Sequence, residues 1–179
     1  MLISKKHIVI LGPPGIGKLT VGRFLADLTD FAIFDNAKTV DLALSIYQYG
    51  TPEFRKYRDK LRFDFYKEIL KNSSIKGLIS TNVLRHPDNW KYFNRIEKMF
   101  SKFGWATKFI LLTADFTKLS ERVNQPDREN KFSLHSTEEI SKWFLENKTH
   151  SIDKYKKCTI INTTELSAQE TANAIINSL

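Results

Sequence analysis

Short apolar runs alternate along this chain with segments in which apolar residues recur every three or four positions. The runs are too short for helices and predict β-strands at residues 8–11, 31–34, 78–80, 107–112 and 158–161. Strands that are apolar along their whole length are typical of a parallel sheet that is covered on both faces. The alternation therefore predicts an α/β fold: a five-stranded, mostly parallel sheet with helices on both faces.

The segments between the runs carry signals for helix starts. Thr51 and Pro52 predict the start of a long helix, because a hydroxyl caps a helix and proline fits its first position. Two later helices are predicted by capping boxes, at Ser136-x-x-Glu139 and Ser167-x-x-Glu170. The long helix is expected to face the core through Phe54, Tyr57, Leu61, Phe65 and Ile69. A further core-facing helix is expected to use Trp90, Phe93, Phe100 and Phe103.

The first strand runs into a glycine-rich turn that leads into a helix. Gly12, Gly17 and Lys18 fit the phosphate-loop pattern G-x-x-x-x-G-K, and Thr20 supplies a hydroxyl. Glycines let backbone N–H groups converge on a phosphate, and the helix N-terminus adds partial positive charge. A strand–turn–helix corner with a chance lysine is the much weaker alternative. The nucleotide-binding residues are expected to be Gly12, Pro13, Pro14, Gly15, Ile16, Gly17, Lys18, Leu19 and Thr20.

Size and composition set limits on the class of protein. A chain of 179 residues with 41% hydrophobic and 27% charged residues is expected to form one domain, residues 1–179. No apolar run approaches the roughly 18 residues of a membrane span. Cys158 is the single cysteine, so no internal disulfide forms, and a cytoplasmic location is expected. The net charge of +8 is spread over several helices, which indicates a solvated surface more than a nucleic-acid site.

The polar residues at the carboxyl ends of the predicted strands are the candidates for chemistry, because ligands of such sheets bind there. They include Asp35 after the second strand and the segment 81–85 after the third. The helical region at about 36–75 is expected to form the acceptor side. The polar segment 124–136 lacks periodicity and carries Arg128 and Lys131, which is typical of an active-site lid.

These motifs resemble the small P-loop kinases of metabolites and nucleotides over most of the chain. Residues 17–23 resemble the Gly-Lys-Ser-Thr-Ile-Gly-Arg opening of shikimate kinases, and Asp35 matches the first aspartate of their Asp-x-Asp. Ala37 stands in place of the second aspartate. Residues 81–85 overlay the Asp-Gly-Phe-Pro-Arg of adenylate kinases, with Thr81 in place of the aspartate and Arg85 retained. The chain looks closest to a shikimate-kinase-like, AAA-family branch of ATP-binding proteins that is poorly characterised.

The resemblance implies ATP and Mg²⁺ as cofactors, and it implies roles for individual residues. Lys18, Asp35 and Arg128 are expected to be catalytic, with Arg122 against the adenine. The acceptor is expected to lie between Asp35, Arg62 and Arg85. Leu19 replaces the hydroxyl that usually holds Mg²⁺, so Thr20 is the weak metal contact. Two alternatives stay open: Asp35 as a helix cap, and Asp41 as the catalytic base.

The sequence therefore predicts an ATP-dependent phosphotransferase that acts on a small, anionic metabolite or nucleotide. The expected partners are ATP and this acceptor, with no membrane and no nucleic acid. The alternative is a nucleotide-binding switch with little turnover, which the missing carboxylates at Ala37 and Thr81 favour. A nucleic-acid-dependent ATPase is weighed lower, because no predicted strand ends in Asp-Glu.

Overall fold

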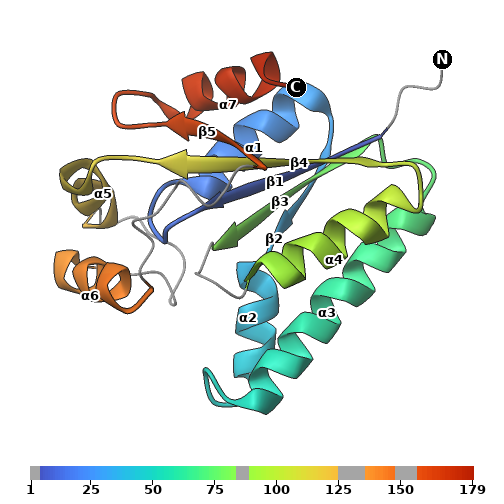
Figure 1. Ribbon diagram of the computed structural model, residues 1–179, viewed down its shortest axis with the longest axis horizontal. Helices are drawn as coiled ribbons and strands as arrows, with labels where there is room; N and C mark the ends of the chain where they lie inside the picture. The colour runs from blue at the N-terminus through green and yellow to red at the C-terminus, as the bar shows by residue number, and fades with distance from the viewer. Residues whose placement is uncertain (1–4, 84–88, 125–135, 148–156) are drawn as a thin grey trace.

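Five parallel strands form one sheet in the order β2-β3-β1-β4-β5 (Figure 1). The computed structural model describes residues 5–83, 89–124, 136–147 and 157–179. The strands are β1 (Lys6–Gly12), β2 (Ala32–Asp35), β3 (Gly77–Val83), β4 (Ala106–Thr113) and β5 (Cys158–Asn162). Each strand lies where an apolar run predicted one, and the predicted α/β class is confirmed.

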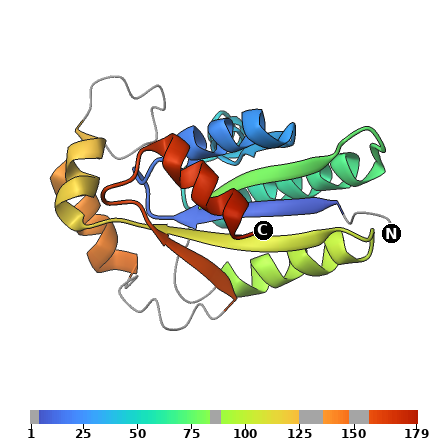
Figure 2. The ribbon, with the colours of Figure 1, turned by 90° about the horizontal axis from the view of Figure 1, so that it is seen from above.

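Helices cover both faces of the sheet. They are α1 (Lys18–Thr29), α2 (Ala37–Leu44), α3 (Pro52–Lys71), α4 (Asn89–Ser101), α5 (Phe116–Val123), α6 (Thr137–Asn147) and α7 (Ala168–Asn177). In Figure 1, α1 and α7 lie above the sheet, and α3 and α4 lie below it. Figure 2 shows α5 and α6 beyond the carboxyl ends of the strands. Of the described helices, none combines the length and the apolar character that a bilayer crossing requires.

The two faces have cores of different character. The face under α3 and α4 is rich in aromatic side chains, among them Phe34, Phe63, Tyr66, Phe93, Phe100 and Trp105. The face under α1 and α7 is aliphatic, with Ile8, Ile10, Leu25, Ile110 and Ile175 fully buried. Along β1 the side chains alternate between these two cores, as the period of a strand requires. A strand that is buried on both sides reads as a continuous apolar run for this reason.

The predicted core face of α3 is partly wrong. Phe54 is buried, but Phe63 and Tyr66 carry the rest of the buried surface, while Phe65 and Ile69 are only partly buried. The first turns of α3 pack on α2, and its later turns pack on the sheet, so the buried face rotates along the helix. Phe103 is also wrong as a core residue: it lies beyond the end of α4 and is 58% exposed.

The predicted caps are present. Thr51 Oγ1 accepts a hydrogen bond from the backbone N–H of Phe54 at 3.2 Å, with Pro52 at the first helical position. Ser136 accepts in the same way from the N–H of Glu139. Ser167 and Glu170 form the complete reciprocal capping box. These signals act over three residues, which is why the sequence alone identified them.

A buried histidine makes the stability of the fold pH-dependent. His7 is fully buried on the aromatic side of β1, where its ring stacks on Phe100 at 4.0 Å and its Nε2 lies 2.8 Å from Ser80 Oγ. Burial lowers the pKa of His7 from 6.5 to about 3. The unfolded chain therefore takes up this proton at a higher pH than the folded protein does. The contribution of a neutral His7 is fully present above pH 6.5 and is lost as the pH falls toward 3.

We expect the free energy of unfolding to fall by up to about 1.4 kcal/mol for each pH unit below 6.5 through this residue. His7→Asn removes the titrating group and should flatten that part of the profile. The measurement is urea unfolding of both proteins between pH 7.5 and 4. Because the carboxylates are common to both, the difference between the two curves isolates His7. Parallel curves would show that His7 does not set this dependence.

Candidate active site

The loop between β1 and α1 contains two glycines in backbone conformations that would strain any other residue. Gly12 ends β1 with a φ of +152°, and a Cβ there would lie 2.9 Å from the carbonyl oxygen of Leu112 on β4. Gly17 has a φ of +93° and is the N-cap of α1. A left-handed residue at this point turns the chain sharply into the helix, so the loop wraps the helix N-terminus.

Lys18 lies over this loop. Its ammonium donates to the carbonyl oxygens of Pro13 at 2.7 Å and Gly12 at 3.2 Å. Ile16, only 2% exposed, fixes the middle of the loop in the aliphatic core. The first turn of α1, which the structure describes completely, carries no acidic side chain. A lysine and an uncompensated helix N-terminus thus share one small region, and both favour a bound polyphosphate.

The described residues fit Mg²⁺ only as an ion shared with a nucleotide. Thr20 is exposed in the first turn of α1, and Leu19 before it is half-buried. Across residues 5–83, 89–124, 136–147 and 157–179, no three His, Cys, Asp or Glu side chains gather in a metal-binding group. A resident metal site is therefore not built from these described residues, and the contact of Thr20 with an ion that nucleotide oxygens hold stays a prediction.

Asp35 and Thr81 end neighbouring strands and contact each other. The two residues are paired in register between β2 and β3. The Thr81 hydroxyl donates to Asp35 Oδ1 at 3.3 Å, and the same oxygen accepts from the backbone N–H of Ala37 at 3.0 Å. Asp35 thus bonds the N–H of the first residue of α2 from the position before the N-cap, Asn36, and its role as a helix cap stays a hypothesis. It also brings a carboxylate next to the strand position where Thr81 replaces the expected aspartate.

Asp41 on α2 is electrostatically coupled to Asp35. Partial burial and, second, the negative charge of Asp35 raise the pKa of Asp41 above its ordinary value. The alternative of Asp41 as base stays a hypothesis beside Asp35.

Arg62 reaches this region from α3. Its Nε donates to Thr39 Oγ1 at 3.0 Å, and the Thr39 hydroxyl donates to the backbone carbonyl of Asn36 at 2.7 Å. Its guanidinium also lies 3.8 Å from Asp59 and 6.0 Å from the ring of Tyr92. Burial lowers the pKa of Arg62, although an arginine stays protonated. A buried cation is thus fixed beside the end of β2.

Asn36, Thr39 and Asn82 were not singled out from the sequence. The side chain of Asn36 donates through Nδ2 to Asn82 Oδ1, and both residues are buried. Asn36 directly follows Asp35, and Asn82 directly follows Thr81. The sequence did offer one signal for Asn36 and Asn82, because each is a polar residue at the carboxyl end of a predicted strand. That these two side chains contact each other depends on the register between the strands, which the sequence does not give.

Comparisons with known proteins agree with this geometry. No protein-family model matches the chain. The chain is 24% identical to a shikimate kinase from Colwellia psychrerythraea over 189 aligned positions, which cover 99% of both proteins. It superposes on a shikimate kinase from Bacteroides thetaiotaomicron with a TM-score of 0.64, 17% identity and 96% coverage of both chains. With the tunicamycin resistance protein of Deinococcus radiodurans the TM-score is 0.63, at 15% identity over 97% of this chain and 95% of the other.

The fold is that of the P-loop kinases. The agreement of sequence and structure over nearly the whole length confirms the resemblance to P-loop nucleotide and small-molecule kinases. At this degree of identity, the comparison establishes the fold alone. The substrate has to be inferred from the residues of this chain.

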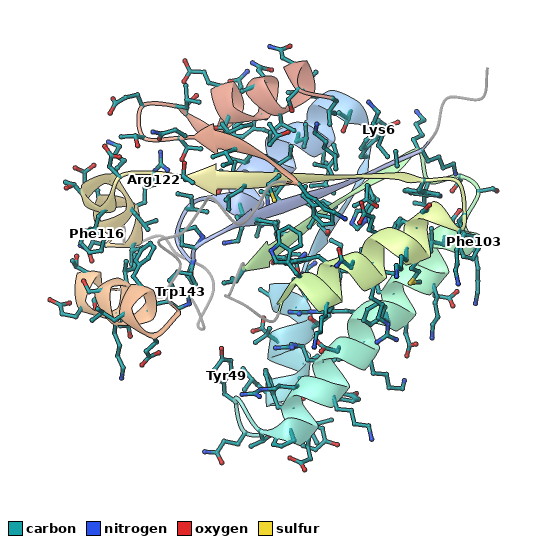
Figure 3. The ribbon with its side chains drawn as sticks, viewed as in Figure 1. Lys6, Tyr49, Phe103, Phe116, Arg122 and Trp143 are labelled. Carbon is teal, nitrogen blue, oxygen red and sulfur yellow. The ribbon has the colours of Figure 1, made fainter. Side chains whose placement is uncertain are left out.

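Arg122 holds the loop after β5. Its guanidinium donates to Thr163 Oγ1 at 2.9 Å, to the Thr163 carbonyl at 2.6 Å and to the Leu166 carbonyl at 3.4 Å. Figure 3 shows Arg122 between α5 and the loop that joins β5 to α7. A guanidinium donates in its own plane, so these bonds fix the orientation of that plane. The predicted contact of Arg122 with adenine stays a prediction.

Other predicted site residues lie outside the described residues. Arg85 belongs to the segment 84–88, and Arg128 and Lys131 belong to 125–135. The ends of the predicted lid are described: Asn124 Nδ2 donates to Thr137 Oγ1 at 3.1 Å. This bond joins the end of α5 to the start of α6. The residues that flank the predicted lid therefore lie close together.

We expect Arg122→Ala to raise the KM for ATP more than it lowers kcat, because stacking on adenine acts alike in ground and transition states. The loss of its three hydrogen bonds should also lower the melting temperature by roughly 6 to 12 °C, at about 1 kcal/mol of unfolding free energy per bond. Steady-state kinetics and thermal unfolding measure the two effects.

A matched control is Lys118→Ala on the same helix, where the ammonium pairs with Glu121 at 3.0 Å. This variant should change neither quantity, because exposed ion pairs contribute little to stability. If Arg122→Ala changes the melting temperature but not the KM for ATP, the residue only holds the loop after β5.

Proposed function

We propose that this protein is an ATP-dependent kinase that transfers the γ-phosphoryl group of ATP to a small, anionic acceptor. The observation that carries the proposal is the position of the Lys18 ammonium on the loop that wraps the N-terminus of α1. Asp35 ends β2, and Arg62 on α3 is linked through Thr39 to the backbone carbonyl of Asn36, the residue after Asp35. The full-length likeness to a shikimate kinase supports the class of reaction, and it disfavours a switch without turnover.

The phosphate loop and Lys18 would bind the triphosphate. Backbone N–H groups at the loop and at the start of α1 would contact the phosphate oxygens, and Lys18 would leave its loop carbonyls for the β- and γ-phosphates. Bound Mg²⁺ would supply charge neutralisation between the β- and γ-phosphates. The residue of the chain that fits beside it is Thr20, which is exposed in the first turn of α1.

Asp35 would orient the acceptor hydroxyl and take its proton. Both hydrogen bonds described for this carboxylate reach Oδ1, so we assign Oδ2 to the acceptor. The Thr81 hydroxyl and the N–H of Ala37 would hold the carboxylate in place during the reaction. Catalysis would then consist of positioning and charge stabilisation, which account for most of the rate enhancement in phosphoryl transfer.

Arg62 would bind the anionic group of the acceptor. Its side chain is only 12% exposed, and the bond to Thr39 fixes its direction. An arginine presents a planar set of donors that matches a carboxylate or a phosphate. Arg85 is proposed as a second cation on this side, and Arg128 as the lid cation that stabilises charge on the transferring group.

The test has two parts. Titration of the protein with ATP, followed by calorimetry, checks nucleotide binding. ADP release is then measured with a set of small hydroxy acids, including shikimate, and with nucleoside monophosphates. Stimulated ADP release with one acceptor class supports the kinase. Tight ATP binding with no stimulation by any of them would favour the nucleotide-binding switch instead.

A further inference from the structure

The hairpin formed by α2 and α3 carries a stripe of exposed apolar side chains. Among the described residues, three large apolar side chains that face solvent fall within eight positions: Leu42 is 51% exposed, Ile46 61% and Tyr49 55%. We call these three residues the apolar stripe. In Figure 1, α2 and the start of α3 extend below the sheet, and the turn between them forms the lower end of the ribbon. The apolar stripe therefore lies on a projecting part of the structure that a second molecule can contact.

Helical geometry places Leu42 and Ile46 in one row along α2. The backbone N–H of Tyr47 donates to the carbonyl oxygen of Ala43 at 2.9 Å, so helical hydrogen bonding continues past the end of α2. Residues four positions apart on a helix lie one above the other, and Lys38, Leu42 and Ile46 therefore share this row. Ala43 belongs to another row and is fully buried. The row of Leu42 and Ile46 is thus a face of α2 that the described residues leave exposed.

Opposite charges lie at the two ends of the apolar stripe. Tyr49 lies at the turn of the hairpin (Figure 3), and its ring is 5.2 Å from the ring of Phe54. This contact brings the first turn of α3, with the exposed Glu53, next to the stripe. At the other end, Lys38 is exposed at the start of the row on α2. The apolar stripe therefore has a cation at one end and an anion at the other.

The charges around the apolar stripe favour a second copy of this chain over a partner of one charge sign. The exposed charged residues of this region are Lys38, Asp41, Glu53, Arg55 and Lys56. Both signs are present, so a strongly acidic or a strongly basic partner would meet like charges. A twofold interface presents the same patch on both molecules, and in an antiparallel arrangement each end of one stripe meets the opposite end of the other. A stripe with opposite charges at its ends is complementary to itself in this arrangement.

We propose that two copies of this chain form a twofold dimer through the apolar stripe, with Lys38 of each copy beside Glu53 of the other. Ile46 is the central residue of the interface, because Lys38 precedes it by eight positions and Glu53 follows it by seven. Burial of the apolar side chains stabilises the dimer, and the two ion pairs determine the antiparallel direction. This inference concerns the surface of the hairpin and does not depend on the proposed kinase function.

Analytical ultracentrifugation of the full chain over a range of protein concentrations tests the inference. We expect a monomer–dimer equilibrium with a Kd on the order of 10 to 100 µM, because three side chains per copy make an interface at the small end of the specific range. Ile46→Lys should raise this Kd by about 100-fold or more, since two like charges would then meet at the twofold axis. The melting temperature of the monomer should stay at the wild-type value, because Ile46 is exposed and a cation is favourable near a helix C-terminus.

A charge exchange tests the direction of the two stripes. Lys38→Glu and Glu53→Lys should each raise the Kd by about three- to tenfold, because each places two like-charged pairs in the symmetric interface. The double variant Lys38→Glu/Glu53→Lys restores both ion pairs and should bring the Kd back to within about twofold of the wild-type value. The matched control is Phe103→Ser, which removes a side chain that is 58% exposed, lies away from the hairpin in Figure 3 and should leave the Kd unchanged.

Three results would overturn the inference. The first is a wild-type protein that stays monomeric at about 1 mM. The second is a dimer that Ile46→Lys leaves intact, which would place the interface on another surface. The third is a double charge variant that dimerises as weakly as the two single variants, which would exclude the antiparallel arrangement. If Ile46→Lys lowers the melting temperature of the monomer, Leu42→Ser in the same row takes its place in the comparison and should likewise weaken the dimer.

Discussion

Lys18→Ala is expected to weaken ATP binding by about 100-fold and to lower phosphoryl transfer by about 1000-fold or more. The ammonium of Lys18 lies 2.7 Å from the Pro13 carbonyl oxygen, directly on the loop that would cradle the phosphates. Its contribution should grow as negative charge develops during transfer, so turnover should suffer more than binding. Calorimetric titration with ATP and measured ADP release report the two effects.

Two further variants make this result specific. Lys38→Ala removes an exposed lysine from α2 and should leave ATP affinity unchanged. Lys18→Arg keeps the charge but replaces a compact ammonium with a planar group, so it should restore binding in part and transfer poorly. Wild-type ATP affinity and turnover in Lys18→Ala would contradict the phosphate-loop assignment.

Asp35→Asn is expected to lower phosphoryl transfer by 10²- to 10⁴-fold, or about 3 to 5 kcal/mol of barrier, and to change ATP affinity only a few-fold. Asparagine keeps an oxygen that can accept from the Thr81 hydroxyl and from the N–H of Ala37. The substitution therefore preserves these contacts and removes the negative charge and the basicity. ATP titration, thermal unfolding and ADP release measured on this one variant distinguish the possible roles.

The cap alternative leads to a different result for the same variant. Asparagine caps helices about as well as aspartate, so stability and turnover would both stay close to wild type. In that case Asp41→Asn becomes the decisive variant, because the charge of Asp35 already raises the pKa of Asp41. A large loss of transfer in Asp41→Asn alone would identify Asp41 as the base.

Much of the fold followed from local signals in the sequence. The apolar runs marked the strands of the sheet, most clearly β1, which is buried on both faces and therefore needs apolar residues. Thr51 and Ser167 marked helix starts because a cap acts within three residues. The buried face of α3 was harder to predict, because the helix changes its packing partner along its length. Phe63 and Tyr66 are buried in the aromatic core against the sheet, although they lie outside the apolar stripe that helix periodicity predicted.

The backbone geometry of the glycine-rich loop after β1 was predictable from the sequence in the same way, whereas its binding of phosphate stays a prediction. Gly12, Gly17 and Lys18 lie within seven positions, and the backbone geometry that they require is local. The sequence also indicated which strand ends carry polar side chains. It did not indicate how these side chains pair, because pairing depends on strand register and on helix placement.

Only the tertiary structure decided the contacts of the acceptor side. Asp35 meets Thr81, and Asn36 meets Asn82, each across 46 positions of sequence, because β2 lies beside β3 in the sheet order. Arg62 meets Thr39 across 23 positions because α3 folds back along α2. Arg122 meets Thr163 across 41 positions. Local chemistry thus determined the phosphate loop, whereas the packing of distant segments determined which groups an acceptor would meet.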